Sequence, residues 1–241
     1  MIKYFFLVLL SFQSVHADLA NDLLKASDHG RGGVADGLSW TIKLETTEEG
    51  DTNIREFFVK AKEHDALVEA TAPPRNKGEL FLFNDRNMWF YKQSLKKPVA
   101  ISSRQKLTGQ AANGDIASTH YYRDYTPTME KEETINGEKF YVLMLKAKSN
   151  NLTYDQIRYW ISDKTKLAMK AEFLTIQGKV FKVGELQYKN NITLSGKSIP
   201  FVSQLKITDA KFKENFSVIN YMNPKTENHS ASVFNVNRLS R

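Results

Sequence analysis

The chain has 241 residues, with 34 Lys or Arg against 27 Asp or Glu, no Cys and 41% apolar residues. This composition is typical of a folded globular protein and excludes a disordered tail. The lack of Cys excludes a disulfide scaffold, a thiolate metal site, a cysteine nucleophile and a lipid anchor on an N-terminal cysteine.

Residues 1–17 have the pattern of a secretory signal peptide. A positive start ends at Lys3, residues 4–12 are almost wholly apolar, and Val15 and Ala17 are the small residues that precede a cleavage site. The apolar run is shorter than the roughly 20 residues that span a bilayer. We expect cleavage after Ala17 and a single mature domain over 18–241 that does not span a membrane. Because large secreted eukaryotic domains usually carry disulfides, we expect the periplasm of a Gram-negative bacterium.

The mature chain begins with a helical pattern and continues with strands. Residues 18–27 place their leucines on one side of a helix that ends near the glycines at 30, 32 and 33. Residues 38–45 then alternate apolar and polar side chains, and this period of two recurs to the C-terminus. Asn136 and Gly137 predict a type I′ hairpin. We expect about ten strands in a largely antiparallel sheet with one or two helices packed on it.

Three segments are apolar on both strand faces: 80–83, 88–91 and 140–145. An antiparallel strand that is apolar on both faces must be covered on both faces. One interpretation is a central strand of an ordinary two-layer core. The other is an apolar cavity inside a curved sheet, which would hold an apolar ligand.

Charge and motifs give little support to nucleic-acid binding or to catalysis. The net charge is +7, but the basic residues are spread at strand spacing with acids between them, as on the wet face of a sheet. No phosphate-binding loop, dinucleotide motif, nucleophile elbow or histidine pair at metal-ligand spacing occurs. We predict no enzyme, no cofactor, no metal site and no nucleic-acid partner. An enzyme would require Asp115, His120 and Asp124 to face one pocket.

The segment 84–91, a turn that leads into Met88-Trp89-Phe90-Tyr91, resembles the Asp-x-x-x-Leu-Trp-Phe-Tyr strand of periplasmic lipoprotein carriers of the LolA type. Further matches follow in order. They are the Pro-Pro-Arg stretch at 73–75, Gly109, Gly114 to Ala117, Asp124-Tyr125, and a Phe-x-x-x-x-Leu tail from Phe234 to Leu239. These residues are similar to the LolA-like branch of outer-membrane lipoprotein-sorting proteins, and the resemblance covers roughly 18–241.

The resemblance implies a mainly β (α+β) fold, a single curved antiparallel sheet that forms an unclosed barrel of about 11 strands with helices covering its concave side. It implies a soluble carrier of lipoprotein acyl chains or other hydrophobic ligands, for outer-membrane lipoprotein sorting or lipid export. Aromatic and Met side chains suit such a cavity because they adapt in shape without requiring hydrogen bonds. The candidate lining residues are Trp40, Phe81, Phe83, Trp89, Tyr91, Phe140, Val142, Met144, Ile157, Tyr159, Met169 and Phe173.

In this family, a basic residue near the Pro-rich stretch is linked to closure of the lid. By this resemblance, Arg75 is the candidate lid or gate residue here. The implied partners are an acylated lipoprotein or a lipid and an inner-membrane transporter, and we expect a monomer. The alternative hypothesis is a periplasmic interaction module that carries nothing and docks on a transporter of the RND type or on another envelope partner.

Overall fold

The computed structural model describes residues 17–117 and 120–240. Of the predicted signal peptide, all but Ala17 lies outside the described residues, so the cleavage site and the domain boundary stay predictions. No helix in the described ranges is long and apolar enough to cross a membrane.

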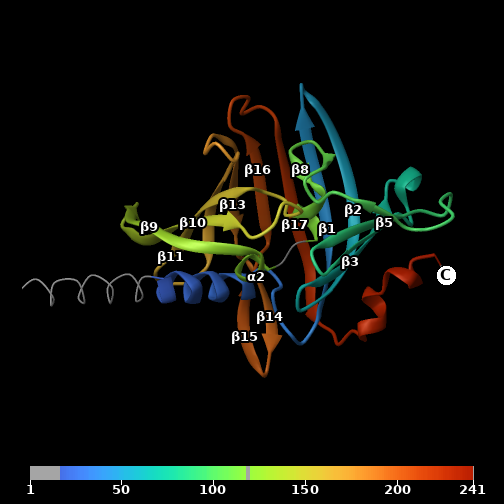
Figure 1. Cartoon of the computed structure of the whole chain (residues 1–241), viewed down its shortest axis with the longest axis horizontal. Helices are drawn as coiled ribbons and strands as arrows, with labels where there is room; N and C mark the ends of the chain where they lie inside the picture. The colour runs from blue at the N-terminus through green and yellow to red at the C-terminus, as the bar shows by residue number, and fades with distance from the viewer. Residues whose placement is uncertain (1–16, 118–119, 241) are drawn as a thin grey trace, which may run out of the picture.

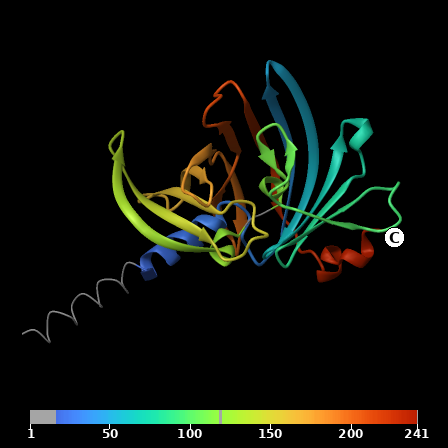
Figure 2. The same cartoon turned by 45° about the horizontal axis from the view of Figure 1, so that its top comes forward.

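The main sheet has 13 strands in the order β6-β5-β4-β3-β2-β1-β17-β16-β13-β12-β11-β10-β9, and every adjacent pair is antiparallel. It curves strongly, and its end strands β6 and β9 do not pair with each other (Figures 1 and 2). The expected single curved and unclosed antiparallel sheet is therefore confirmed, with 13 strands where about 11 were expected.

Apart from the main sheet, two hairpins form sheets of their own, β7–β8 and β14–β15. In chain order the strands are β1 Leu38–Glu48, β2 Asp51–Lys62, β3 Asp65–Ala72, β4 Leu80–Asn84, β5 Asn87–Tyr91, β6 Val99–Ile101, β7 Lys106–Thr108, β8 Ala111–Ala112, β9 Tyr125–Ile135, β10 Glu138–Ala147, β11 Gln156–Ser162, β12 Ala168–Leu174, β13 Val180–Gln187, β14 Asn190–Leu194, β15 Lys197–Phe201, β16 Gln204–Asp209 and β17 Phe216–Thr226.

Local sequence accounts for these strands and turns. In β1 the apolar side chains of Leu38, Trp40, Ile42 and Leu44 are buried, as the period of two requires. Between β9 and β10, Asn136 and Gly137 have φ of 51° and 81°, which is the positive pair that a type I′ turn needs. The predicted hairpin at this position is present.

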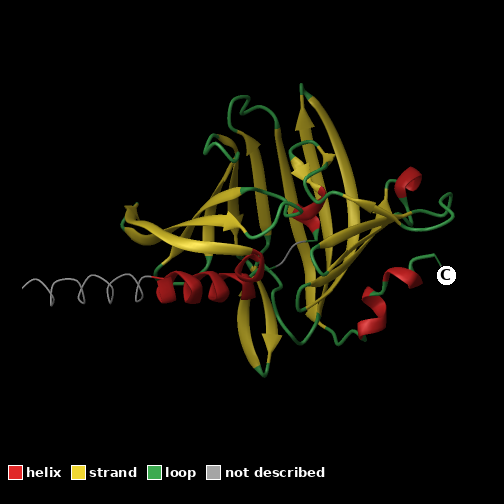
Figure 3. Cartoon of the chain, viewed as in Figure 1, coloured by secondary structure: helices red, strands yellow, loops and turns green. Residues whose placement is uncertain are grey.

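Helical segments lie on both faces of the sheet (Figure 3). The N-terminal helix, residues 17–29, packs Ala20, Leu23 and Leu24 into the main core, together with the inward residues of β1. The short elements η2 (Asn113–Ile116) and α2 (Tyr121–Asp124) contribute to the same core. These segments cover the concave face, as the resemblance implies.

The C-terminal elements η3 (Ala231–Phe234) and η4 (Val236–Arg238) cover the opposite face of β4 and β5. Phe234 and Leu239 pack against Leu82 in a cluster separate from the main core. This second cover is why segments 80–83 and 88–91 are apolar on both faces, and η1 (Pro74–Asn76) leads from β3 toward the same strands.

The β7–β8 hairpin fills part of the concave face near β1 and β17. Gly109 lies at its turn with φ of 53°, and a Cβ at this position would lie 2.6 Å from side-chain atoms of Thr46 and Ser217. The backbone N–H of Gln110 donates to Ser217 Oγ at 2.8 Å. Glycine is therefore required here both for its backbone conformation and for the close approach.

Candidate functional site

The structure places half of the predicted lining residues on the inner face of the sheet. They are buried in the main core with the N-terminal helix: Trp40, Phe81, Phe83, Ile157, Tyr159 and Phe173. These side chains come from four strands, β1, β4, β11 and β12, and lie on one face because each strand contributes every second residue. Their role in ligand binding stays a prediction.

The other predicted lining residues do not belong to this inner cluster. Trp89 and Tyr91 pack against the C-terminal segment on the opposite face. Phe140 and Val142 form a separate cluster with Trp160. Successive residues of a strand point to opposite faces of the sheet. The residues predicted from the sequence included neighbours of both kinds, so they could not all lie on the concave face.

Two methionines from the predicted lining also fall outside the inner cluster. Met144 is half-buried on β10 and alternates with the inward Leu143 and Leu145, whereas Met169 on β12 is 36% exposed. Neither contributes a buried side chain to the concave face.

The concave face contains more polar groups than the sequence indicated. Several tyrosine rings are buried there, among them Tyr121, Tyr154 and Tyr159, and the guanidinium of the buried Arg31 lies 4.2 Å from the centre of the Tyr121 ring. The Tyr154 hydroxyl lies 2.9 Å from both carboxylate oxygens of Asp115, whose pKa is raised by burial. The interior thus contains amphipathic rings, and the polar end of Tyr154 is held by a hydrogen bond within the protein.

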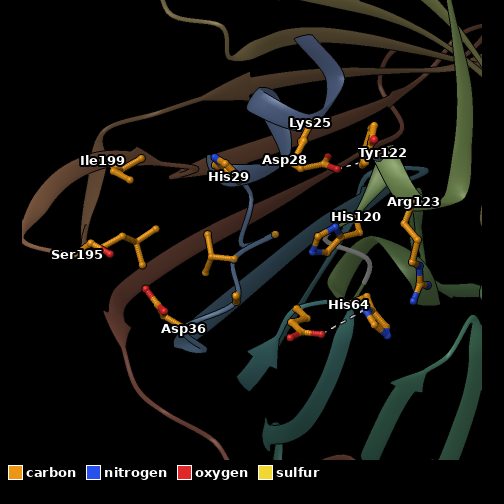
Figure 4. A pocket seen from close by; sticks show the side chains of 15 residues that line it. Lys25, Asp28, His29, Asp36, His64, His120, Tyr122, Arg123, Ser195 and Ile199 are labelled. Carbon is orange, nitrogen blue, oxygen red and sulfur yellow. Dashed lines mark hydrogen bonds and ion pairs between the residues drawn. The ribbon is translucent and has the colours of Figure 1, made fainter. Parts of the chain in front are cut away.

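A pocket of about 570 Å³ opens beside this interior, where the N-terminal helix ends (Figure 4). Its walls come from the helix, the loop that follows, the β2–β3 turn, the approach to α2 and the β14–β15 hairpin. Its lining residues are Lys25, Asp28, His29, Gly33, Val34, Ala35, Asp36, Glu63, His64, His120, Tyr122, Arg123, Leu194, Ser195 and Ile199. This volume is within the range of small-molecule sites.

Asp28 and His120 are the most perturbed groups of the pocket. Burial raises the pKa of Asp28 from 3.8 to about 7, although the carboxylate accepts the backbone N–H of Tyr122 at 2.8 Å. Burial, with the nearby charge of Arg123, lowers the pKa of His120 to about 4. At neutral pH the imidazole is therefore uncharged, and the carboxyl group exists in both protonation states.

Sequence reasoning missed Asp28, because nothing in a short helix distinguishes one aspartate from another. Its role depends on α2, since Asp28 and Tyr122 are 94 positions apart in the chain. The cluster that begins at His120 was visible as a dense run of polar aromatics, but its closeness to the N-terminal helix is a tertiary feature.

The residues that an enzyme would need are not gathered in this pocket. Of Asp115, His120 and Asp124, only His120 lines it. Asp115 is held by Tyr154, and the buried Asp124 pairs with Arg86 at 3.0 Å and with Arg123 at 2.8 Å. Over residues 17–117 and 120–240, no group of three or more acidic or histidine side chains is placed to hold a metal ion.

Arg75 lies on η1 with its side chain exposed, away from the pocket. Its charge acts on Arg55, which forms a 2.9 Å ion pair with Glu79. Burial lowers the pKa of Arg55, and the charge of Arg75 adds to this effect. A gating role for Arg75 stays a prediction.

Comparisons with known proteins agree with this architecture. A family model described as "Uncharacterized protein" matches residues 62–241. A search of curated proteins finds no match. A LolA superfamily protein from Nitrosomonas europaea is similar in structure with a TM-score of 0.80 and 27% identity, over 90% of this chain and 97% of that one.

Two further solved structures show the same fold. A DUF1329 family protein from Desulfovibrio piger has a TM-score of 0.76 and 19% identity, covering 93% of this chain and 99% of the other. A domain assigned to outer membrane lipoprotein sorting from Vibrio parahaemolyticus also has a TM-score of 0.76 and 19% identity, covering 93% and 100%. The chain is a member of the family whose model it matches and, with its fold, of the LolA superfamily.

Proposed function

We propose that this protein is a soluble periplasmic carrier that binds acyl chains or other hydrophobic groups on the concave face of its sheet, in outer-membrane lipoprotein sorting or lipid export. One observation carries the proposal. The concave apolar face of the unclosed sheet is covered by short segments, among them the N-terminal helix and the two-stranded β7–β8 hairpin. Such a cover can be displaced without unfolding the sheet.

The size of the helix contact makes displacement energetically feasible. The helix buries Leu23 and Leu24, with 3% and 0% of their surface exposed. Exposing two leucines costs about 3–6 kcal/mol. A bound acyl chain gains about 0.8 kcal/mol for each buried methylene. About four to eight methylenes therefore offset the lost helix contact, which is fewer than a membrane acyl chain contains.

Binding of a fatty-acid series of increasing chain length tests the proposal. We expect saturable one-to-one binding that tightens about fourfold per methylene and then reaches a plateau when the concave face is filled. Native mass spectrometry of protein purified from periplasm without detergent should show acylated species that remain bound.

A matched pair of variants separates this mechanism from adsorption to the surface. Leu24→Ala weakens the helix cover and should tighten binding of the longest chains. Leu82→Ala removes an equally buried leucine on the opposite face and should leave binding unchanged. Absence of saturable binding, or the same response to both variants, contradicts the carrier function and favours the docking module.

A further inference from the structure

The pocket at the end of the N-terminal helix has one wall with two buried polar atoms that lack a partner among the described residues (Figure 4). They are Asp28 Oδ1 and His120 Nε2. A buried polar atom without a hydrogen bond is costly, and native structures rarely leave one where a ligand or a water does not reach it. Both residues line the pocket, so a bound molecule can satisfy both atoms.

Gly33 lies against both of these residues, and its lack of a side chain keeps the space beside them open. A Cβ at this position would lie 3.1 Å from the Asp28 Cβ atom and 3.2 Å from His120 Nε2. A side chain here would therefore press on both Asp28 and His120 in the wall of the pocket. The glycine leaves room for one small polar group of a ligand.

The chemistry of this wall selects a hydrogen-bond donor. The other oxygen of Asp28, Oδ2, already accepts the backbone N–H of Tyr122 at 2.8 Å, so Oδ1 is the acceptor that remains. His120 brings no positive charge at neutral pH, because burial lowers its pKa to about 4. A primary ammonium is the donor that best suits a buried carboxylate beside a neutral imidazole, since its charge also compensates that of the carboxylate.

An exposed cation lines the same pocket. Lys25 precedes Asp28 by one turn on the same helix and also lines the pocket. Side chains three residues apart are neighbours on a helix surface. The ammonium of Lys25, 5.8 Å from the centre of the Tyr122 ring, can therefore meet an anionic group attached close to the ligand's own ammonium. Val34 and Ile199 supply an apolar wall for the rest of the molecule.

We infer that this pocket binds the phosphoethanolamine head group of an amphiphile, with the ammonium on Asp28 and the phosphate on Lys25. This inference rests on the proposed function, because it names the head group of the cargo whose chains the concave face would hold. The shared chemistry is a primary ammonium two carbons from a phosphate, whether it belongs to a lipid or to the free compound.

Calorimetric titration with two lipids of identical short chains, below their micelle-forming concentrations, tests this assignment. Phosphatidylethanolamine has N–H donors for Asp28, whereas phosphatidylcholine presents a trimethylammonium that has none. Since a hydrogen bond to a charged group contributes strongly, we expect the first lipid to bind about tenfold to a hundredfold more tightly. Free phosphoethanolamine is titrated as a third ligand.

Two variants and one control locate the site. Asp28→Asn should abolish the preference for phosphatidylethanolamine while phosphatidylcholine still binds, because the amide keeps an acceptor for the Tyr122 N–H but loses the charge. Lys25→Gln, at an exposed position where folding is not at risk, should weaken both lipids by the same factor. Asp22→Asn, exposed on the same helix and outside the pocket lining, should change neither.

The outcomes separate this assignment from the carrier function. Equal binding of both lipids to the unmodified protein, or a preference that survives Asp28→Asn, overturns the head-group site and leaves the carrier standing. If neither lipid binds but free phosphoethanolamine binds in an Asp28-dependent way, the site stands and the carrier function fails. If nothing binds, both are wrong.

Discussion

Replacing Asp28 by Asn is expected to stabilise the protein above neutral pH and to leave its stability near pH 4 almost unchanged. The pKa of this carboxyl group is about 7 in the folded protein, against 3.8 ordinarily. In the folded state Asp28 therefore holds its proton up to near neutral pH, while the unfolded chain loses it near pH 4. The contribution of Asp28 to the stability of the unmodified protein consequently falls as pH rises from about 4 to 7 and is constant above.

The magnitude follows from this difference. About three pKa units at about 1.4 kcal/mol each give an upper value of about 4 kcal/mol. Relaxation and water entry through the pocket reduce the cost of a buried charge, so we expect about 2–4 kcal/mol at pH 8. The amide keeps the acceptor for the Tyr122 N–H, so the local hydrogen bond is not lost.

Urea unfolding of both proteins, followed by tryptophan fluorescence from pH 4 to 8, measures this difference. His120 acts in the opposite direction, because its pKa is lowered to about 4 and its contribution is lost as pH falls from 6.5 toward that value. This contribution is common to both proteins and cancels between them. Asp22→Asn on the same helix is the control. A difference that does not grow with pH, or an Asn variant that is less stable at pH 8, would refute the reasoning.

Three further substitutions test the fold by the same unfolding assay at pH 7. Phe234→Ala should lower the free energy of unfolding by about 3 kcal/mol and make the C-terminal segment accessible to limited proteolysis. The reason is that the ring is only 3% exposed and packs on the outer face of β4 and β5. Unchanged proteolysis would argue against this cover. Gly137→Ala should lower the free energy of unfolding by about 1–2 kcal/mol, and Gly109→Ala should lower it by more. Both glycines have positive φ, but only at Gly109 would a Cβ lie 2.6 Å from other side chains. Equal losses of stability in the two variants would contradict this close approach. Asp124→Asn should lower the free energy of unfolding by about 2 kcal/mol, because it breaks the ion pairs of Arg86 and Arg123 with this carboxylate. The loss is moderate because both arginines are partly exposed to solvent. Unchanged stability would mean that the two ion pairs contribute nothing.

The sequence identified the strands because their information is local. The alternation in residues 38–45 and the positive-φ pair at Asn136 and Gly137 depend only on neighbouring residues, and both are present in the structure. The resemblance to the LolA-like family added two predictions: that the curved sheet does not close into a barrel, and that helices cover its concave face. The number of strands in the main sheet differed because it depends on which short hairpins join the sheet and which remain separate.

The face that each side chain occupies was decided by tertiary structure. In a segment that is apolar on both sides, such as 88–91, periodicity gives two equivalent choices. The structure resolves them because the C-terminal tail covers Trp89 and Tyr91, while Met88 and Phe90 face the main core. The C-terminal segment is more than a hundred residues away in the chain, so the alternation of apolar and polar residues in 88–91 cannot show which face it covers.

By itself, the sequence determined a cysteine-free, basic, aromatic-rich chain that forms one antiparallel sheet with a helix at its start. Only the tertiary structure decided that Asp28 and His120 meet on one wall of a pocket, with the buried Arg31 among the tyrosines of the neighbouring interior. The physical reason is that burial creates these properties. An aspartate with a pKa of about 7 and a histidine with one of about 4 are ordinary residues until distant elements remove them from water.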